Sequence, residues 1–554
     1  MFSQSIRQST ARAAAEDSYG FSIIGKPRLI EGSMPMNPRI LIALMLFAGT
    51  WAVDVMDLPF RSLWPSLLAL LLVFLLRSAL AGLLAGALAG ALLLAGGNPY
   101  AAVIRFVEVH LTGSLQSAWN IRVLVFTMLM GGFVGIIEAG GGLQGLVRRF
   151  LGDGKPQAKR VLWSSVGMGL VCFFDGLANS LMVGRVMRPL ADKAGVAREK
   201  LAYVVDSTSS PIACIALIST WSATQLALIK AGLDQVGAAG NPYLLFLESI
   251  PYNFYCWFTL LLVFLVIARN FDVGPMRKAQ PHPAEDQAEQ IQSAPAYQAL
   301  VPLATLIALI LAGLYISGSD RLFPSSLQDL AMGFGRSKTD LVLVCASALA
   351  CVVAAILNRR SIQSSIGEVF MRGVTSLLVP ALILVAAWCL TSTLNALGAK
   401  DTLTGMLQGR LSPHMLPVAV FFTGAMTSFF TGTSWGTMAV LMPLSVPLAF
   451  TIGGDLPPDV VHHLLVSVIA AVFSGAVFGD HCSPISDTTL VSSVACDVQP
   501  MDHVQAQLPY ALIAAVLAAA AGFIPAGFGL PAWMGLLLGA AVLTGLTQWA
   551  KIRG

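Results

Sequence analysis

Residues 464–493 read LLVSVIAAVFSGAVFGDHCSPISDTTLVSS. The first part, 464–480, is apolar until it reaches Asp480, and its length suits a helix that crosses a bilayer. The second part gathers hydroxyl side chains and Asp487 around Pro484, which cannot donate a backbone hydrogen bond and disrupts a helix. An acid at membrane depth usually lines a pathway or pairs with a cation, because an unpaired charge there is costly. The stretch therefore predicts a membrane helix that is interrupted at a polar, cation-binding site.

The composition of the whole chain agrees with a membrane location. Of 554 residues, 56% are hydrophobic and only 11% are charged, whereas soluble domains average about 25% charged residues. The formal net charge of +4 is small, and the basic residues form short clusters between apolar runs. Such clusters set membrane topology and do not form a nucleic-acid surface. We therefore predict an all-α polytopic membrane protein whose partner is the lipid bilayer, with no nucleic-acid partner.

Thirteen apolar runs are candidates for membrane segments, because a span needs about 20 apolar residues. They are 39–57, 63–96, 121–141, 161–184, 203–229, 243–269, 297–317, 340–357, 373–397, 411–454, 464–480, 509–528 and 530–549. Since 63–96 is long enough for two spans, we expect about 12 to 14 membrane segments. The predicted division is a polar N-terminal segment (1–37), a first transmembrane repeat (38–269), a hydrophilic linker (270–296) and a second transmembrane repeat (297–554).

Basic residues suggest how the chain is oriented. Before the first span Arg7, Arg12, Lys26, Arg28 and Arg39 outnumber Glu16, Asp17 and Glu31, which favours a cytoplasmic N-terminus. Basic clusters also flank segment 161–184 on both sides. This segment either enters and leaves on the same side of the membrane, or it is an ordinary span with one flank that breaks the rule.

Two motifs occur twice, in the same order. Residues 173–176 read FFDG and residues 429–432 read FFTG. Downstream of each copy, an acid is followed by Ser-Pro-Ile, at Asp206 with 210–212 and at Asp480 with 483–485. Repeats that meet at interrupted helices are a common plan of secondary transporters. We therefore expect two inverted repeats with broken or re-entrant helices.

The prolines of the repeated motif, Pro211 and Pro484, predict the helix breaks. Freed carbonyls and nearby hydroxyls would then serve as oxygen ligands; the hydroxyls are those of Thr208, Ser209, Ser210, Ser483 and Ser486. The alternative is a pair of proline-kinked spans in which the hydroxyls merely satisfy the freed backbone.

Acids in apolar surroundings point to cation chemistry. An alkali cation prefers hard oxygen ligands, which carboxylate, hydroxyl and carbonyl groups supply. Removal from water favours the neutral form of an acid, so one carboxylate can hold either a proton or a metal ion. Other roles stay open for three residues: Asp206 as a helix cap, His481 as a structural side chain, and Glu138 as a secondary site.

Four stretches are similar to a known family. FFDGLANSLMVGRVMRPLADK (173–193), REKLAYVVDSTSSPIACIALISTW (198–221), FFTGTSWGTMAVLMPL (429–444) and VFGDHCSPISDTTLVSS (477–493) together resemble the NhaC-type sodium/proton antiporter family. The resemblance covers about residues 40–530 and implies an antiporter of the bacterial inner membrane with inverted repeats. Relatives in the larger group exchange sodium or protons against organic anions or amino acids. Similar proteins often have a second acid where this chain has Gly176, so ion identity and stoichiometry stay open.

The hypothesis from the sequence is sodium/proton antiport by alternating access. The sodium ion and the proton would share the carboxylates of Asp206, Asp480 and Asp487. Neutral oxygens would come from Thr433, Ser434, Thr437, Ser483, Ser486 and Thr488, with support from Asp175, Asn179, Thr208, Ser209, Ser210 and His481. The alternative is sodium- or proton-coupled exchange of an organic anion or amino acid.

We expect no enzymatic activity and no cofactor, because no nucleotide-binding loop is present and Na⁺ and H⁺ are the transported species. A homodimer is left open.

Overall fold

The computed structural model describes residues 38–56, 58, 60–151, 157–283, 294–399, 402, 412–454 and 456–553. The predicted N-terminal segment 1–37 and residues 284–293 of the predicted linker lie outside the described residues. The chain divides into two units after Ile42, and the second, Ala43–Gly554, contains every site discussed below. Its described residues form helices joined by turns and short loops, and their one isolated β-bridge joins Ala197 and Pro281.

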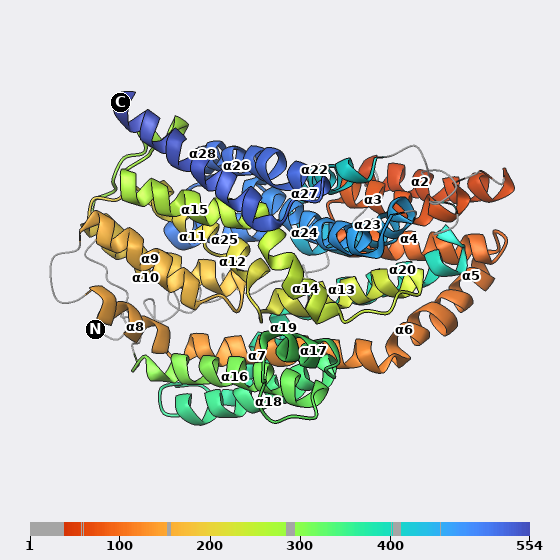
Figure 1. The fold of residues 1–554 in the computed structure, drawn as a ribbon, viewed down its shortest axis with the longest axis horizontal. Helices are drawn as coiled ribbons and strands as arrows, with labels where there is room; N and C mark the ends of the chain where they lie inside the picture. The colour runs from red at the N-terminus through yellow and green to blue at the C-terminus, as the bar shows by residue number, and fades with distance from the viewer. Residues whose placement is uncertain are drawn as a thin grey trace, which may run out of the picture. The chain divides into compact units, whose positions relative to one another are not determined.

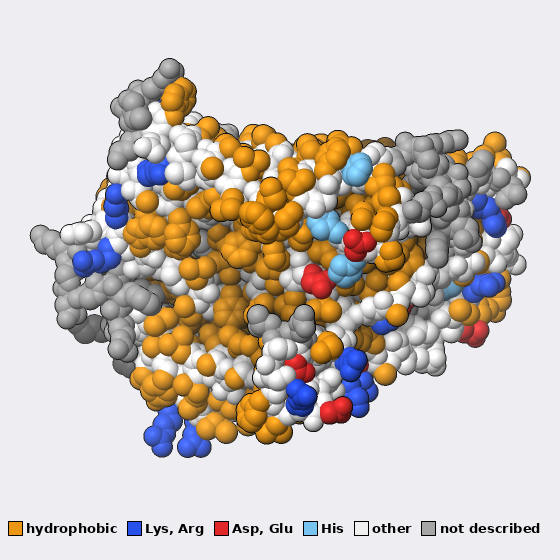
Figure 2. Space-filling model, viewed as in Figure 1, with side chains coloured by type: hydrophobic (Ala, Val, Ile, Leu, Met, Phe, Trp, Pro, Cys, Tyr) orange, Lys and Arg blue, Asp and Glu red, His pale blue; other side chains and the backbone are white. Residues whose placement is uncertain are grey.

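Among the described residues, 11 helices are long and apolar enough to cross a membrane, or up to 13 if two bent pairs each count as one span. The helices are α2 (Pro38–Val55), α7 (Ala118–Ala139), α15 (Phe254–Arg269), α16 (Tyr297–Gly318), α18 (Thr339–Asn358), α20 (Leu378–Ala396), α22 (Leu416–Thr431), α23 (Ser434–Gly453), α24 (Pro458–Cys482), α26 (Pro500–Leu517) and α28 (Ala532–Arg553). Figure 2 shows a face covered largely by hydrophobic side chains, as contact with lipid requires. The predicted all-α polytopic fold is confirmed.

One bent pair was missed in the sequence. The helix α4 (Ala79–Leu94) is followed at an angle of 115° by the helical stretch Pro99–Gln116. That stretch contains Arg105, Glu108 and His110, which interrupt its apolar run. The structure buries His110, whose Nδ1 lies 2.9 Å from the hydroxyl oxygen of Ser392. A search for apolar runs therefore misses a membrane helix whose polar side chains face the protein interior.

Each FF-x-G motif lies at the tip of a helical hairpin. The first hairpin consists of α9 (Ala158–Val171) and α10 (Gly176–Lys193), and the second of α22 and α23. In the first, the side-chain amide of Asn179 donates to the carbonyl of Gly169 at 2.9 Å. In the second, a Cβ on Gly424 would lie 3.5 Å from Leu441 Cδ1. Residues at equal distances from each tip are thus neighbours, so both segments fold back on themselves.

This result decides between the two alternatives for segment 161–184, because a hairpin returns the chain to the side from which it came. Figure 1 shows the first hairpin on the left and α22 and α23 on the right, with their turns towards the middle.

The acid–Ser-Pro-Ile motifs lie at two helix breaks. Residues 483–486 separate α24 from α25 (Asp487–Cys496), so the second Ser-Pro-Ile is non-helical as predicted. In the first copy the break falls at Thr208 and Ser209, between α11 (Arg198–Ser207) and α12 (Ser210–Ile215). Pro211 lies in the first turn of α12, where its missing N–H removes no helical hydrogen bond. The break predicted at Pro211 therefore lies before it, at Thr208 and Ser209, and the first Ser-Pro-Ile is helical, so its predicted position is wrong.

Small residues position the end of α24 against the second hairpin. A Cβ on Gly475 would lie 2.5 Å from the carbonyl oxygen of Phe421. One turn later, a Cβ on Gly479 would lie 2.3 Å from the backbone nitrogen of Phe429. Such close approach of two backbones is the usual way in which membrane helices pack. It brings the end of α24, with Asp480, next to the tip of the second hairpin.

Candidate cation site

Asp480 lies in the last turn of α24 and is 2% exposed. Four hydroxyl groups donate to its carboxylate. Those of Ser210 and Ser434 each lie 3.2 Å from Oδ2, that of Thr488 lies 3.1 Å from Oδ2, and that of Ser486 bonds Oδ1. They come from α12, the start of α23, the α24–α25 break and α25.

No described Lys, Arg or His forms an ion pair with Asp480. An ionised carboxylate in this position is surrounded by neutral dipoles and lacks a counter-charge. It therefore offers a cation a set of hard oxygen atoms.

A small cavity adjoins this carboxylate, and we call it the cation cavity. It has a volume of about 40 Å³, and Asp480 shares its wall with Asp175, Thr433 and Asp487. Trp221 and Trp435 also line it, with ring centroids 5.8 Å apart. Ligand pockets for organic molecules usually measure about 300–1,000 Å³, whereas one water occupies about 30 Å³. The cavity is therefore of a size that suits a small ion.

The tips of both hairpins reach the cation cavity through helix N-caps. The Asp175 carboxylate caps α10 by accepting from the backbone N–H of Ala178 at 2.8 Å, and it also accepts from the hydroxyl of Thr220 at 2.7 Å. Thr433 caps α23 by accepting from the N–H of Gly436 at 3.2 Å. Asp175 and Thr433 thus play the same role, since each caps the second helix of its hairpin. The FF-x-G pattern had paired Asp175 with Thr431, two residues earlier.

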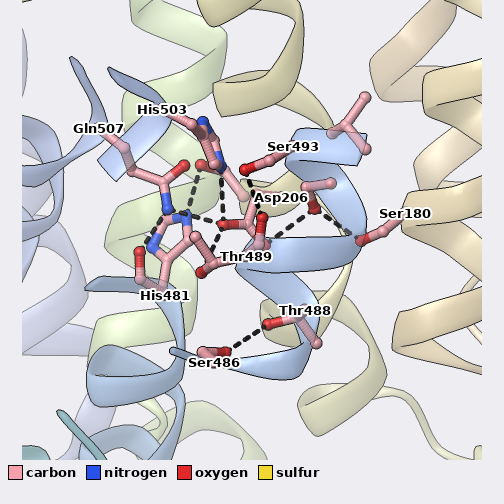
Figure 3. Close-up of polar contacts among 12 residues, drawn as sticks. Ser180, Asp206, His481, Ser486, Thr488, Thr489, Ser493, His503 and Gln507 are labelled. Atoms are coloured by element: carbon pink, nitrogen blue, oxygen red, sulfur yellow. Dashed lines mark hydrogen bonds and ion pairs between the residues drawn. The ribbon is translucent and has the colours of Figure 1, made fainter. Parts of the chain in front are cut away.

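Asp206 has a different environment, which Figure 3 shows. This fully buried residue lies in α11, and its Oδ2 accepts from Gln507 Nε2 at 2.7 Å and lies 3.3 Å from His503 Nε2. The hydroxyls of Thr489 and Ser492 donate to its two oxygens at 3.3 and 3.2 Å. Asp206 does not cap a helix, because its carboxylate oxygens are occupied by these four donors from the second half of the chain.

The two acids of the repeated motif are therefore bound reciprocally. Asp480, in the second half, accepts from Ser210 of the first half. Asp206, in the first half, accepts entirely from the second half. Thr489 joins the two environments, since its hydroxyl lies 2.9 Å from the Asp480 carbonyl oxygen and 3.3 Å from Asp206 Oδ2.

Other predicted ligands bond to the protein itself. The ring nitrogens of His481 lie 2.9 Å from Ser207 Oγ and 2.7 Å from Tyr255 OH. Both nitrogens thus bond to the protein, which favours a structural role for His481. Four hydroxyls satisfy local backbone groups: Thr208 donates to Val204, Ser209 to Asp206 and Thr437 to Thr433, and Ser483 accepts from Ile485. The hydroxyls of Thr208, Ser209 and Ser483 thus satisfy backbone groups, as the second alternative held, although both helices are broken.

Asn179 connects two interruptions in the first half. Its side-chain amide donates to the carbonyls of Gly169 and Thr208, at 2.9 and 2.8 Å. Thr208 lies in the α11–α12 break, so the carbonyl freed there bonds to Asn179 and is not directed at a cation. Asn179 thus holds the first hairpin against the broken helix.

His503 and Gln507 contact Asp206 from α26, and neither was predicted as a site residue. They lie four residues apart in α26, and this spacing places two polar side chains on one face. It is the signal that could have identified them.

Comparison with known proteins identifies the family. The model of the Na⁺/H⁺ antiporter family matches residues 212–528, which is more than half of the chain. The chain belongs to the Na⁺/H⁺ antiporter family. The matched region contains the second hairpin and Asp480, whereas the first hairpin and Asp206 precede it. The resemblance seen in the sequence is confirmed, and the protein is a multi-pass membrane transporter.

Relatives of this Na⁺/H⁺ antiporter family member extend the comparison. An uncharacterised protein of Haemophilus influenzae is 28% identical over 432 residues, or 76% of this chain and 80% of that protein. The malate-2H⁺/Na⁺-lactate antiporter of Bacillus subtilis is 32% identical over 161 residues, or 28% of this chain and 32% of that protein.

Solved structures share the fold. The YdaH transporter of Alcanivorax borkumensis has a TM-score of 0.54 at 16% identity, covering 77% of this chain and 90% of that one. MtrF of Neisseria gonorrhoeae has a TM-score of 0.54 at 16% identity, covering 79% of this chain and 85% of that one.

Proposed function

We propose that the protein exchanges Na⁺ for H⁺ by alternating access, and that the Asp480 carboxylate is the exchange site. The observation that supports this most is a buried carboxylate with four hydroxyl donors, no cationic partner among the described residues, and an ion-sized cavity beside it. Protonation of the carboxylate removes the negative charge that attracts Na⁺. Each ion therefore displaces the other, which couples the two fluxes.

The ligands follow from the contacts of Asp480. Ser210, Ser434, Ser486 and Thr488 would turn their oxygen lone pairs towards Na⁺ when it binds, since a hydroxyl is both a donor and an acceptor. Asp487 lies exposed on the wall of the same cavity and would attract the cation without enclosing it. Asp206, which already accepts four hydrogen bonds, would hold the two halves together, with His503 as its counter-charge when protonated.

Alternating access would use the two hairpins. Both of their tips line the cation cavity, so movement of either tip would open Asp480 towards a different side. Na⁺ and H⁺ are substrates in this scheme, and no cofactor takes part. The proposal also places the protein in the bacterial inner membrane with a cytoplasmic N-terminus, which reporter fusions test. It further includes a homodimeric assembly, which sedimentation of the purified protein tests.

Coupled exchange of an organic solute is the second candidate. The name of the Bacillus subtilis relative, a malate-2H⁺/Na⁺-lactate antiporter, favours it. The cation cavity is too small for such a solute, so this function needs a second cavity.

Purified protein in vesicles with an imposed pH gradient tests the proposal. Added Na⁺ should collapse the gradient in the parent protein, and the Asp480→Asn variant should not respond. Asp459→Asn is the matched control, because Asp459 lies exposed at the start of the same helix. Collapse of the gradient by Na⁺ in both variants alike would contradict the proposal.

A further inference from the structure

A second, larger cavity adjoins the cation cavity, and we call it the large cavity. It has a volume of about 520 Å³ and lies between α7, the first hairpin and α19 (Ile366–Ser376). Four residues line both cavities and form a shared wall: Asp175, Leu177, Ser376 and Leu377. An ion that enters the large cavity is therefore next to the cation cavity.

The large cavity extends from the shared wall towards one end of α7. A Cβ on Gly131 would lie 3.0 Å from Leu377 Cδ1, which belongs to the shared wall. From Gly131 the lining continues along α7 to Glu138 and to Ala139, the last residue of the helix. This stretch spans about 12 Å at about 1.5 Å per residue. The cavity thus leads from the cation cavity to the last turn of a helix long enough to cross a membrane.

This end of α7 lies on the side of the base of the first hairpin. In the described part of the chain, α8 (Gly142–Leu151) separates α7 from α9, and a helix of that length is too short to cross a hydrocarbon core of about 30 Å. Along α10 the lining also runs from Asp175, at the tip, towards the base, as far as Leu181. Basic clusters flank this hairpin, which predicts that its base faces the cytoplasm.

Arg372 indicates that the large cavity is accessible to water. This exposed residue lines the cavity beside Gly373, and a Cβ on Gly373 would lie 2.1 Å from the carbonyl oxygen of Gly131, inside α7. A charged side chain at membrane depth almost always faces the protein interior or a water-filled cavity, because hydrocarbon does not solvate it. An ion can therefore enter the large cavity with part of its hydration shell.

The side chains along this path favour a cation. Four carboxylates line the two cavities: those of Glu138, Asp175, Asp480 and Asp487. The guanidinium of Arg372 opposes them in the large cavity, and Arg185 acts on Glu138 from outside the lining. Asp175 already accepts hydrogen bonds as the cap of α10. Glu138, in contrast, lies in the last turn of α7, where a cation would enter.

Two aromatic side chains cover the cation cavity on its other side. Trp221 lies at the start of α13 (Thr220–Val236) and Trp435 at the start of α23, with ring centroids 5.8 Å apart. A Cβ on Gly232 would lie 2.7 Å from Val446 Cβ, so the two helices run side by side from this ring pair. They run towards the base of the second hairpin, which Figure 1 shows opposite that of the first.

We propose that the large cavity is the route by which the transported cation reaches Asp480 from the cytoplasmic side, and that Glu138 attracts the cation into it. This inference rests on the proposed exchange at Asp480 and adds a residue to it. Low-dielectric walls focus the field of a carboxylate into a cleft, which raises the local concentration of cations and their rate of entry.

Sodium-driven proton movement by the purified full-length protein in vesicles tests the role of Glu138. Glu138→Gln should raise the Na⁺ concentration for half-maximal exchange about tenfold at low ionic strength. Glu138→Asp keeps the charge and should resemble the parent, whereas Arg372→Gln should lower this concentration because it removes a like charge. Glu368→Gln is the matched control, since Glu368 is exposed on α19 and lies outside the lining. A parent-like Glu138→Gln, or an equal change in the control, would overturn the proposal.

Ionic strength separates attraction of the ion from a structural role of Glu138. The Debye length falls from about 30 Å at 0.01 M to about 3 Å at 1 M salt. The difference between Glu138→Gln and the parent should therefore shrink as choline chloride is raised over this range. A difference that stays constant would mean that Glu138 supports the fold and does not attract the ion, which would overturn its assignment.

The route itself is tested with a cysteine in the lining. Leu181→Cys is made in a Cys345→Ser background, because Cys345 is the exposed cysteine of the chain. The reference is Lys193→Cys, at the exposed base of the first hairpin. A membrane-impermeant methanethiosulfonate should modify both cysteines from the same side in sealed membrane vesicles. No modification of Leu181→Cys, or modification from the opposite side alone, would overturn the route.

Asp480→Asn, measured in the same vesicles, distinguishes this inference from the proposed function. If Asp480→Asn exchanges like the parent while the Glu138 and Leu181 variants behave as expected, the route holds and the proposed site at Asp480 fails. If Asp480→Asn is inactive while Glu138→Gln resembles the parent or Leu181→Cys is not modified, only this inference fails.

Discussion

Replacement of Asp480 by Asn removes the negative charge of the cation site with little change in its shape. At an effective dielectric constant of about 20, two unit charges 4 Å apart attract by about 4 kcal/mol. Each 1.4 kcal/mol is about a factor of ten in binding, so Asp480→Asn should weaken Na⁺ binding about 1,000-fold. At accessible sodium concentrations this amounts to loss of exchange.

The same substitution should leave the fold intact. Because no described basic residue pairs with Asp480, the variant leaves no buried cation without a partner, which is the usual reason that such changes destabilise a protein. The amide oxygen can still accept hydrogen bonds from the hydroxyls of Ser210, Ser434 and Thr488.

The assay is sodium-dependent dequenching of a pH-sensitive dye in vesicles, together with a thermal unfolding curve in detergent. We expect no dequenching and an unfolding temperature equal to or above that of the parent. Asp459→Asn should behave like the parent in both measurements. If Asp480→Asn exchanges ions with less than a tenfold change in sodium dependence, Asp480 is not the cation ligand. If the variant fails to fold, an amide at position 480 cannot replace the carboxylate as the partner of these hydroxyls.

Three further predictions follow from the same contacts. Because proton and Na⁺ compete for Asp480, the Na⁺ concentration for half-maximal exchange should rise about tenfold for each unit by which the pH falls, once the acid is mostly protonated; a value that stays constant with pH would argue for separate sites. Asp487→Asn should change this concentration less than tenfold, because Asp487 is exposed on the cavity wall and solvent screens its charge; a loss as large as that of Asp480→Asn would reverse the roles given to the two acids. Asn179→Ala should lower the free energy of unfolding by about 1–3 kcal/mol, because it leaves the buried carbonyls of Gly169 and Thr208 without a donor; an unchanged unfolding temperature would show that Asn179 does not hold the first hairpin in place.

The sequence predicted the helix breaks, because they depend on local chemistry. Proline and clustered hydroxyls at 483–486 disfavour a continuous helix through local hydrogen bonding. The same chemistry placed the first break incorrectly, because Pro211 is compatible with the first turn of a helix as well as with a break. Likewise, Thr431 and Thr433 are both acceptable caps, and only the position of the helix start shows that Thr433 is the cap.

The partners of the acids were harder to predict, because they come from distant segments. Asp206 contacts His503 and Gln507, which lie about 300 residues away in the chain. The sequence also does not show the hydrogen-bond partner of a hydroxyl, since Thr208 can bond either to the preceding helical turn or to a ligand. Ser210 and Ser434 were expected ligands, and the structure brings both to Asp480. This contact depends on how the tip of the second hairpin packs against the broken helix, which the sequence does not show.

In the proposed exchange, Na⁺ and H⁺ occupy the Asp480 carboxylate in turn. Proton release on sodium binding tests it directly, with purified protein in weakly buffered detergent solution and a pH-sensitive dye. Addition of Na⁺ to the parent at a pH where the acid is protonated should release protons in proportion to the Na⁺ bound, and the Asp480→Asn variant should release none. Sodium binding to the parent without proton release, or equal release from the variant, would contradict the account.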